Sequence, residues 1–245
     1  MIKLGISGIA GRMGKRIGAL ASKDKDFAIK VALESPDNPA VGKDAGEILG
    51  LAKIRSIVTS DFGRVAGDCD VLIDFTFPDV TMEHLEIARK NNIGMVIGTT
   101  ALSEEQVKKI EVAAKEIPIV FSPNMSVGAN LLFKLTEIAA KALDKSYRVE
   151  IVEAHHARKK DAPSGTAKRL GEAVSKVRGE TPPIESIREG DIVGDHSVIF
   201  KGENERIELK HSAYSRDTFA RGALDAAKFI AGRKSGLYSM FDVIK

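Results

Sequence analysis

The first half of the chain alternates short apolar runs with amphipathic stretches, and this alternation limits its possible folds more than any other feature. Apolar runs with the length of buried strands cover residues 2–7, 29–34, 71–75, 94–98 and 119–122. Stretches with helical spacing of apolar residues lie between them at 12–22, 79–91 and 103–116. Strands that alternate with helices are typical of a parallel sheet. The sequence therefore predicts an α/β domain over this region.

The last of these helical stretches carries its own start signal. The Ser103 side chain can accept a hydrogen bond from a first-turn amide, and Gln106 can reach back toward Ser103. Leu102 and Val107 have the spacing of an apolar contact across the first turn. This pattern predicts that a helix begins at Ser103.

The character of the sequence changes after Asn124. We expect an apolar-faced helix over 127–143 and a strand over 148–154. Residues 197–201 and 206–210 alternate apolar and polar side chains around Gly202-Glu203-Asn204, which is typical of an antiparallel hairpin with one solvated face. The sequence therefore predicts a second, α+β domain with a mixed, largely antiparallel sheet, and then an amphipathic helix over 217–231.

Three glycines, Gly8, Gly11 and Gly14, follow the first predicted strand and open the first predicted helix. A dinucleotide site needs small residues where the backbone approaches the pyrophosphate, and a helix N-terminus that faces the negative charge. The spacing is G-x-x-G-x-x-G instead of the commoner G-x-G-x-x-G. We interpret the turn as part of a Rossmann-type dinucleotide site, while a tight turn without ligand remains the alternative.

Glu34 ends the second predicted strand, where a carboxylate can accept hydrogen bonds from a ribose diol. A solvated charge at the end of a strand is the alternative. Ser35 follows Glu34, and no basic residue stands there to pair with a 2′-phosphate. We therefore expect NADH to be used at least as well as NADPH, although Arg12 or Lys15 can still reach a 2′-phosphate.

Two polar loops follow later predicted strands, Gly98-Thr99-Thr100 and Ser122-Pro123-Asn124-Met125. The carboxyl ends of strands in open parallel sheets are where ligands bind. These loops are therefore candidates to hold the nicotinamide ring, and the alternative is that each is only a polar turn.

The densest group of reactive side chains lies between Glu153 and Ala167. His155 and His156 are adjacent at a strand end and point to opposite faces, which disfavours a shared metal ion. A histidine can donate a proton near neutral pH, and Lys159 can hold a carboxylate or protonate an anion. Pro163-Ser164-Gly165-Thr166 precedes a helical stretch whose first amides suit a second carboxylate. A solvated loop flanked by structural histidines is the alternative.

The composition argues against several classes of protein. Basic and acidic residues nearly balance, with 37 against 34, so we expect no nucleic-acid partner. Cys69 is the only cysteine and is expected to be a small core residue; no cysteine and histidine cluster has zinc-site spacing, so we expect no metal. No apolar run reaches the roughly 20 residues that span a bilayer, and no secretion signal is evident, so we expect a cytoplasmic protein.

Taken together, these motifs resemble the dihydrodipicolinate reductase (4-hydroxy-tetrahydrodipicolinate reductase) family of bacterial lysine biosynthesis. The resemblance runs over almost the whole chain and rests on the pattern E-x-H-H-x-x-K-x-D-x-P-S-G-T-A at 153–167. It also includes the glycine turn, the Gly98 loop, the segment 124–128 and the ending 235–243. The chain departs from many relatives at Ser35, where arginine is frequent, and at Ser122-Pro123, where two alanines are frequent.

The resemblance implies roles for individual residues. His155 is expected to be the proton donor, Lys159 a second catalytic group and His156 a substrate contact, while Ser164, Gly165 and Thr166 hold a substrate carboxylate. The cofactor-binding residues that it implies are Gly8, Ile9, Ala10, Gly11, Arg12, Met13, Glu34, Gly98, Thr99, Thr100, Ser122, Pro123, Asn124 and Met125.

The resemblance also implies an organisation and an activity. We expect residues 1–126 and 216–245 to form the dinucleotide-binding domain and 127–215 the domain for substrate binding and tetramerisation, in a homotetramer. The expected reaction is reduction of a small cyclic dicarboxylate to tetrahydrodipicolinate by NADH or NADPH. Another Rossmann-type amino-acid or semialdehyde dehydrogenase and a non-catalytic dinucleotide sensor are the alternatives.

Overall fold

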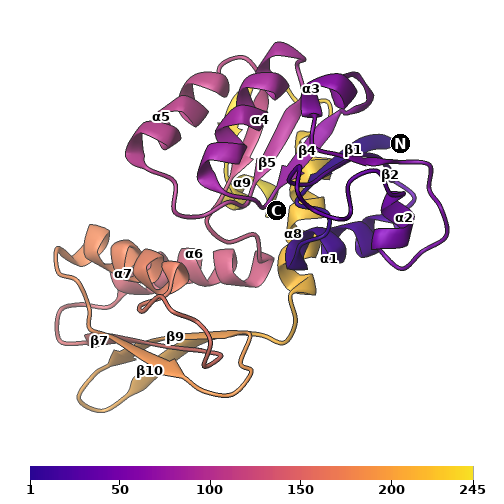
Figure 1. Cartoon of the computed structure of the whole chain (residues 1–245). Helices are drawn as coiled ribbons and strands as arrows, with labels where there is room; N and C mark the ends of the chain where they lie inside the picture. The colour runs from indigo at the N-terminus through magenta and orange to yellow at the C-terminus, as the bar shows by residue number, and fades with distance from the viewer. Residues whose placement is uncertain (245) are drawn as a thin grey trace. The chain divides into compact units, whose positions relative to one another are not determined.

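The computed structural model describes residues 1–244, so Lys245, the last residue of the expected first domain, lies outside the described residues. The chain divides into two compact units. One consists of Met1–Met125 and the segment that begins at Phe219, and the other of Ser126–Thr218. In Figure 1 the yellow helix α8 (Asp217–Ile230) accordingly lies beside the indigo N-terminal elements.

The first unit is built on a seven-stranded parallel sheet of order β11-β6-β5-β4-β1-β2-β3. The five predicted strands are confirmed to within two residues at each end. The sheet also has two short edge strands that the sequence did not predict. The strands are β1 (Ile2–Ser7), β2 (Phe27–Leu33), β3 (Val58–Thr59), β4 (Val71–Asp74), β5 (Gly94–Ile97), β6 (Pro118–Phe121) and β11 (Gly236–Tyr238).

Helices cover both faces of this sheet (Figure 1). Side chains such as Ile6 and Ile73 pack with α1 (Arg12–Ala21) and α8, and Leu72 and Met95 pack on the opposite face. The helices on that opposite face are α3 (Phe62–Val65), α4 (Pro78–Lys90) and α5 (Glu104–Ala113). Because each strand alternates its side chains between the faces, the almost wholly apolar strands supply two cores. Short α2 (Ala45–Ile48), η1 (Ala66–Asp68) and α9 (Met240–Val243) complete the unit.

Two local predictions in this unit are confirmed. Ser103 caps α5: its hydroxyl accepts from the Gln106 amide at 3.2 Å, and the Gln106 side chain accepts from the Ser103 amide at 2.9 Å. Cys69 is buried in the core on the α4 side, and burial raises the pKa of its thiol to about 12. The helix thus starts where the sequence predicted, and Cys69 is unsuited to act as a nucleophile.

The second unit is a four-stranded mixed sheet of order β10-β9-β7-β8 with two long helices. Strands β7 (Arg148–His155), β9 (Gly194–Lys201) and β10 (Arg206–Ala213) are antiparallel neighbours, which confirms the predicted hairpin. The unpredicted β8 (Ile184–Arg188) runs parallel to β7. Helix α6 (Val127–Ala142) lies beside α7 (Gly165–Arg178), and both contact the sheet.

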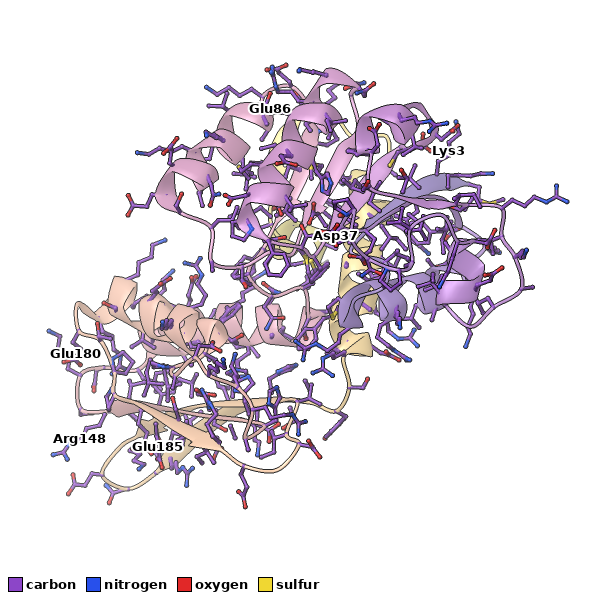
Figure 2. All side chains as sticks on the ribbon, in the orientation of Figure 1. Lys3, Asp37, Glu86, Arg148, Glu180 and Glu185 are labelled. Atoms are coloured by element: carbon purple, nitrogen blue, oxygen red, sulfur yellow. The ribbon has the colours of Figure 1, made fainter. Side chains whose placement is uncertain are left out.

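Charged side chains of both signs point away from these elements into solvent, as Glu86, Arg148 and Glu180 do in Figure 2. Within residues 1–244, no helix has the length and apolar character needed to cross a membrane.

Candidate active site

The turn between β1 and α1 has a shape that depends on glycine. Gly8 has a φ of +72°, which other residues rarely adopt, and a Cβ on Gly14 would lie only 2.1 Å from the Gly8 carbonyl oxygen. Helix α1 begins at Arg12 without a side-chain cap and without an acidic residue in its first turn. The positive end of the helix therefore faces the turn without a side-chain cap or a first-turn acid of its own, and this arrangement suits a phosphate group.

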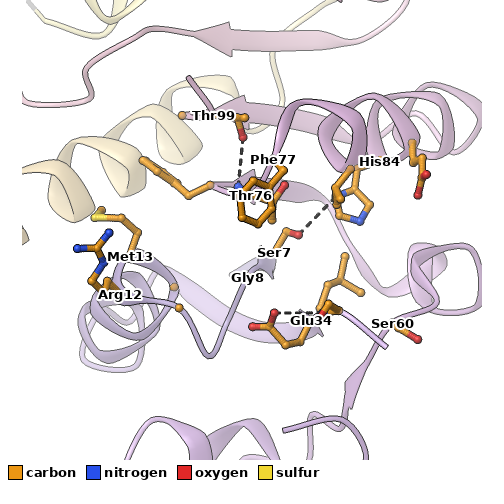
Figure 3. A pocket seen from close by; sticks show the side chains of 18 of the residues that line it. Ser7, Gly8, Arg12, Met13, Glu34, Ser60, Thr76, Phe77, His84 and Thr99 are labelled. Atoms are coloured by element: carbon orange, nitrogen blue, oxygen red, sulfur yellow. Dashed lines mark hydrogen bonds between the residues drawn. The ribbon is translucent and has the colours of Figure 1, made fainter. Parts of the chain in front are cut away.

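The turn opens onto a cavity of about 560 Å³ at the carboxyl ends of the strands (Figure 3). This volume suits a sizeable organic ligand. Eight of the predicted cofactor-binding residues line it, from three separate segments of the chain. They are Gly8, Gly11, Arg12, Met13, Glu34, Gly98, Thr99 and Thr100. The glycine turn and the Gly98 loop, which are about 90 residues apart, therefore face one cavity, and this fits the binding of an extended dinucleotide.

Glu34 connects the end of β2 to the glycine turn. One carboxylate oxygen accepts a hydrogen bond from the Ala10 amide at 2.9 Å, and the other accepts from the Ser35 amide at 3.1 Å. Glu34 and Ser35 both line the cavity. Since each carboxylate oxygen can accept more than one hydrogen bond, Glu34 retains capacity for a ribose hydroxyl.

The other predicted cofactor residues do not line this cavity within the described part of the chain. Ile9 and Met125 are buried in the apolar core on the α1 side, and Ala10 uses its amide to bond Glu34. In the loop after β6, the Ser122 hydroxyl donates to the Asn124 carbonyl oxygen at 2.9 Å, and Pro123 is exposed. Their predicted contact with the cofactor stays a prediction.

A buried polar cluster beside the cavity was missed by the sequence analysis. The fully buried Asp74 at the end of β4 lies 2.7 Å from Nδ1 of His84 on α4, and it accepts hydrogen bonds from the amide and hydroxyl of Thr76 at 3.0 and 2.6 Å. The Thr81 hydroxyl donates to Thr99 at 2.8 Å. Thr76, His84 and Thr99 all line the cavity (Figure 3). An acid at a strand end, with one threonine and one histidine in the next helix, was the available signal.

In the second unit, the predicted catalytic histidine belongs to a buried charged group on β7 and β8. His155 Nδ1 lies 2.5 Å from Oε2 of Glu153, which is fully buried. Arg188 donates to both oxygens of that carboxylate, at 2.9 and 2.7 Å. Glu153 and His155 are two residues apart on one strand, so their side chains share one face of the sheet.

The ionisation of this group follows from its contacts. Burial alone would raise the pKa of Glu153, but hydrogen bonds from Arg188, Ser186, His155 and Ser164 lower it to about 2. Burial lowers the pKa of His155, and the hydrogen bond to Glu153 acts in the opposite direction. Glu153 is therefore a carboxylate throughout the physiological pH range.

The N-terminus of α7 lies next to this group. The Ser164 amide donates to Glu153 at 3.1 Å, and the Ser164 hydroxyl caps the helix by accepting from the Ala167 amide at 3.2 Å. Gly165 is exposed, and no atom would lie within 4 Å of a Cβ added to it. Helix α7 therefore begins where the sequence predicted a helix N-terminus, and the exposed Gly165 leaves space beside its first turn. The binding of a substrate carboxylate there stays a prediction.

Lys159 lies on the loop between β7 and α7. Its ammonium group donates to both oxygens of Asp161, at 2.7 and 2.8 Å, and its side chain is 22% exposed. Burial raises the pKa of Asp161, but the hydrogen bond and charge of Lys159, a backbone hydrogen bond and the charge of Arg188 together lower it below the ordinary value. An incoming carboxylate would therefore compete with Asp161 for Lys159.

His156 follows β7 and is half-buried, and its Nδ1 has no hydrogen-bond partner in the described structure. Across residues 1–244, no three histidine, cysteine, aspartate or glutamate side chains lie where they could hold a metal ion together.

The comparisons with known proteins cover the whole chain. The family model described as "Dihydrodipicolinate reductase, N-terminus" matches residues 2–125, and the one described as "Dihydrodipicolinate reductase, C-terminus" matches residues 128–244. A 4-hydroxy-tetrahydrodipicolinate reductase of Nitrosomonas eutropha is 46% identical, over 100% of this chain and 98% of that protein. One of Dechloromonas aromatica is also 46% identical, over 99% of this chain and 97% of that protein.

Solved structures agree with these matches. A dipicolinate-bound dihydrodipicolinate reductase from Paenisporosarcina sp. TG-14 has a TM-score of 0.82 and 25% identity, with full coverage of both chains. An amine dehydrogenase from Mycobacterium smegmatis, at 13% identity and a TM-score of 0.73, shares the fold.

Proposed function

Because this chain belongs to the dihydrodipicolinate reductase family, we propose that it reduces a small cyclic, unsaturated dicarboxylate to tetrahydrodipicolinate, with loss of water from the hydroxylated form. The family is one of oxidoreductases in lysine and diaminopimelate biosynthesis. The observation that best supports this assignment within the structure is the grouping of the Glu153–His155 pair, Lys159 and the open N-terminus of α7 in one unit.

The cofactor in this proposal is NADH or NADPH. The glycine turn would hold the pyrophosphate, Glu34 the adenosine ribose, and the Gly98 and Ser122 loops the nicotinamide. The lack of room for a Cβ at Gly14 and the uncapped start of α1 support this fit. When bound, the nicotinamide supplies the hydride. Ser35 offers no positive charge to a 2′-phosphate, so NADH is used at least as well as NADPH.

His155 is the proton donor in the proposed reaction. Delivery of hydride to a conjugated imine builds negative charge on the substrate, and an acid must supply a proton as that charge develops. Lys159 and the amides of Gly165 and Thr166 hold the two substrate carboxylates, and His156 contacts the ring. Holding both carboxylates orients the ring for reaction.

The test is an assay in which a dihydrodipicolinate synthase supplies the substrate and the oxidation of NADH and NADPH is followed by absorbance. His155→Ala is expected to lower kcat by roughly 100-fold or more, the range for loss of a general acid. Lys159→Ala is expected to lower kcat and raise KM, and Lys160→Ala, at the exposed neighbouring lysine, serves as the control. Near-wild-type kcat in His155→Ala would remove His155 from the mechanism.

The same family membership leads us to propose a cytoplasmic homotetramer that assembles through the sheets of the second unit and needs no metal. Light scattering after gel filtration would give a particle of about four chain masses if this is correct. Metal analysis of the active, purified protein tests whether the activity requires a metal ion.

A further inference from the structure

The carboxylate of Glu153 is hydrogen-bonded to several groups of the candidate active site. Oε2 lies 2.5 Å from His155 Nδ1 and 2.9 Å from Arg188 Nη1, and Oε1 lies 2.7 Å from Arg188 Nη2 and 3.1 Å from the Ser164 amide. The side chain is fully buried. A carboxylate removed from water is costly unless it is paired and hydrogen-bonded, and here each oxygen has two donors.

Arg188 extends this contact network to the loop that carries Lys159. Besides the carboxylate of Glu153, its Nη2 donates to the Asp161 carbonyl oxygen at 2.6 Å. Asp161 is the residue whose side chain holds Lys159. One buried carboxylate is therefore linked to the proposed proton donor, to the start of α7 and to the Lys159 loop.

We propose that Glu153 is a positioning residue for the reaction, which fixes the orientation and tautomer of the His155 ring. The proposal rests on the role given to His155 above. An ionised carboxylate only accepts hydrogen bonds, so Nδ1 of His155 must carry a proton in both charge states of the ring. This leaves Nε2 as the nitrogen that gains and loses the exchangeable proton.

Among the charged and titratable groups around His155, Glu153 is the one that favours the protonated form of the His155 ring. The cations Lys159 and Arg188 both disfavour a protonated ring. His196 on β9 contacts His155 edge to face, with ring centroids 5.1 Å apart, and its own pKa is lowered to about 3 by burial and by the charge of His155. Asp161 is paired with Lys159. Among residues 1–244, Glu153 is the anion hydrogen-bonded to the ring, so its loss destabilises the imidazolium.

The experiment compares Glu153→Gln with Glu150→Gln in the full-length protein. Glu150 is on the same strand, where it pairs with Lys201 at the surface. Glu150→Gln therefore makes the same substitution outside the hydrogen bonds that join Glu153, His155 and Arg188. Nitrogen NMR of the histidine rings, with His155→Asn for assignment, reports the tautomer and titration of His155. Steady-state kinetics across pH and the Kd for dipicolinate are measured on the same variants.

In the wild type, the neutral His155 ring is expected to carry its proton on Nδ1. In Glu153→Gln the His155 pKa is expected to fall, and the alkaline limb of kcat/KM is expected to move to lower pH with it. The expected loss in kcat is on the order of 10- to 100-fold, by analogy with the range for carboxylates that orient metal-ligating histidines. Glu153→Asp keeps the charge and should restore part of the lost kcat, and Glu150→Gln should match the wild type.

An unchanged tautomer and titration of His155 in Glu153→Gln would overturn the proposal. A loss of kcat with an unmoved pH profile and an equal loss of dipicolinate binding would also overturn it, because that pattern indicates a purely structural role. If Glu153→Gln does not fold, Glu153→Asp is compared with the wild type: its shorter carboxylate is expected to lower both kcat and the His155 pKa, and wild-type values of both would overturn the proposal. Near-wild-type kcat in His155→Ala would instead contradict the role proposed for His155, and the NMR result would still report on the contact with Glu153.

Discussion

Replacing Gly14 with alanine adds a methyl group against the backbone of the turn that we assign to the dinucleotide. The new Cβ would lie 2.1 Å from the Gly8 carbonyl oxygen and 2.7 Å from the Ile9 Cα. Favourable contacts between such atoms begin at about 3.5 Å, so α1 and the turn must separate by roughly 1.4 Å. The turn cannot easily move, because the Gly8 and Ile9 amides both donate to the Leu33 carbonyl oxygen, at 3.0 and 3.1 Å.

The magnitude follows from two opposing effects. Overpacking costs about 1–3 kcal/mol, and the upper end applies because the atoms in the way belong to the backbone. Alanine in a helix is favoured over glycine by about 0.5–1 kcal/mol. The expected net loss for Gly14→Ala is about 2 kcal/mol, which for a domain of this size lowers Tm by roughly 4–8 °C. Displaced turn amides should also weaken NADH binding by at least about tenfold, or 1.4 kcal/mol.

Thermal unfolding by circular dichroism and NADH binding by calorimetry measure the two effects. Gly171→Ala in helix α7 is the matched control, since its Cβ would make an ordinary contact of 3.4 Å with Ile184. This control is expected to keep its NADH affinity and to have an equal or higher Tm. If Gly14→Ala unfolds and binds NADH as the wild type does, the glycine turn does not have the constraint that we assign to it.

Three further predictions concern other parts of the two units. Asp74→Asn places an amide against His84 and is expected to cost about 1–3 kcal/mol and weaken NADH binding; an unchanged Tm and Kd would count against the buried cluster. The pKa of Glu153 is about 2 in the folded protein, against an ordinary value of 4.5. The ionised carboxylate therefore stabilises the folded state by roughly 3 kcal/mol. This stabilisation is complete above pH 4.5 and is lost as the pH falls toward 2. Urea unfolding should therefore show a steeper loss of stability below pH 4.5 in the wild type than in Glu153→Gln, and parallel curves would refute this. Ser35→Arg adds a guanidinium at the cavity and should raise the NADPH-to-NADH ratio of kcat/KM by about tenfold, whereas an unchanged ratio would show that this position does not face a 2′-phosphate.

Local sequence patterns predicted the strands and helices whose own residues show an apolar run or a capping motif. The five inner strands are mostly apolar, and Ser103 with Gln106 marks the start of α5. The short edge strands β3 and β11, of two and three residues, are too short to show any periodicity, and they form because a neighbouring strand offers hydrogen bonds. Strand β8 was missed because its residue types, Ile-Glu-Ser-Ile-Arg, do not alternate strictly between apolar and polar, although their exposure does.

The sequence by itself determined which residue types stand at the carboxyl ends of the strands and at the starts of α1 and α7, because glycine spacing, capping residues and apolar periodicity are local properties. Only the tertiary structure decided which of these side chains meet. Arg188 reaches Glu153 because β8 pairs with β7 in parallel, with Arg188 opposite His155 and Ser186 opposite Glu153. Asp74 meets Thr99 because β4 and β5 are neighbours in the sheet. Partners of this kind are set by which strands become neighbours in a sheet and by how helices pack on it, and these contacts join segments that lie far apart in the sequence.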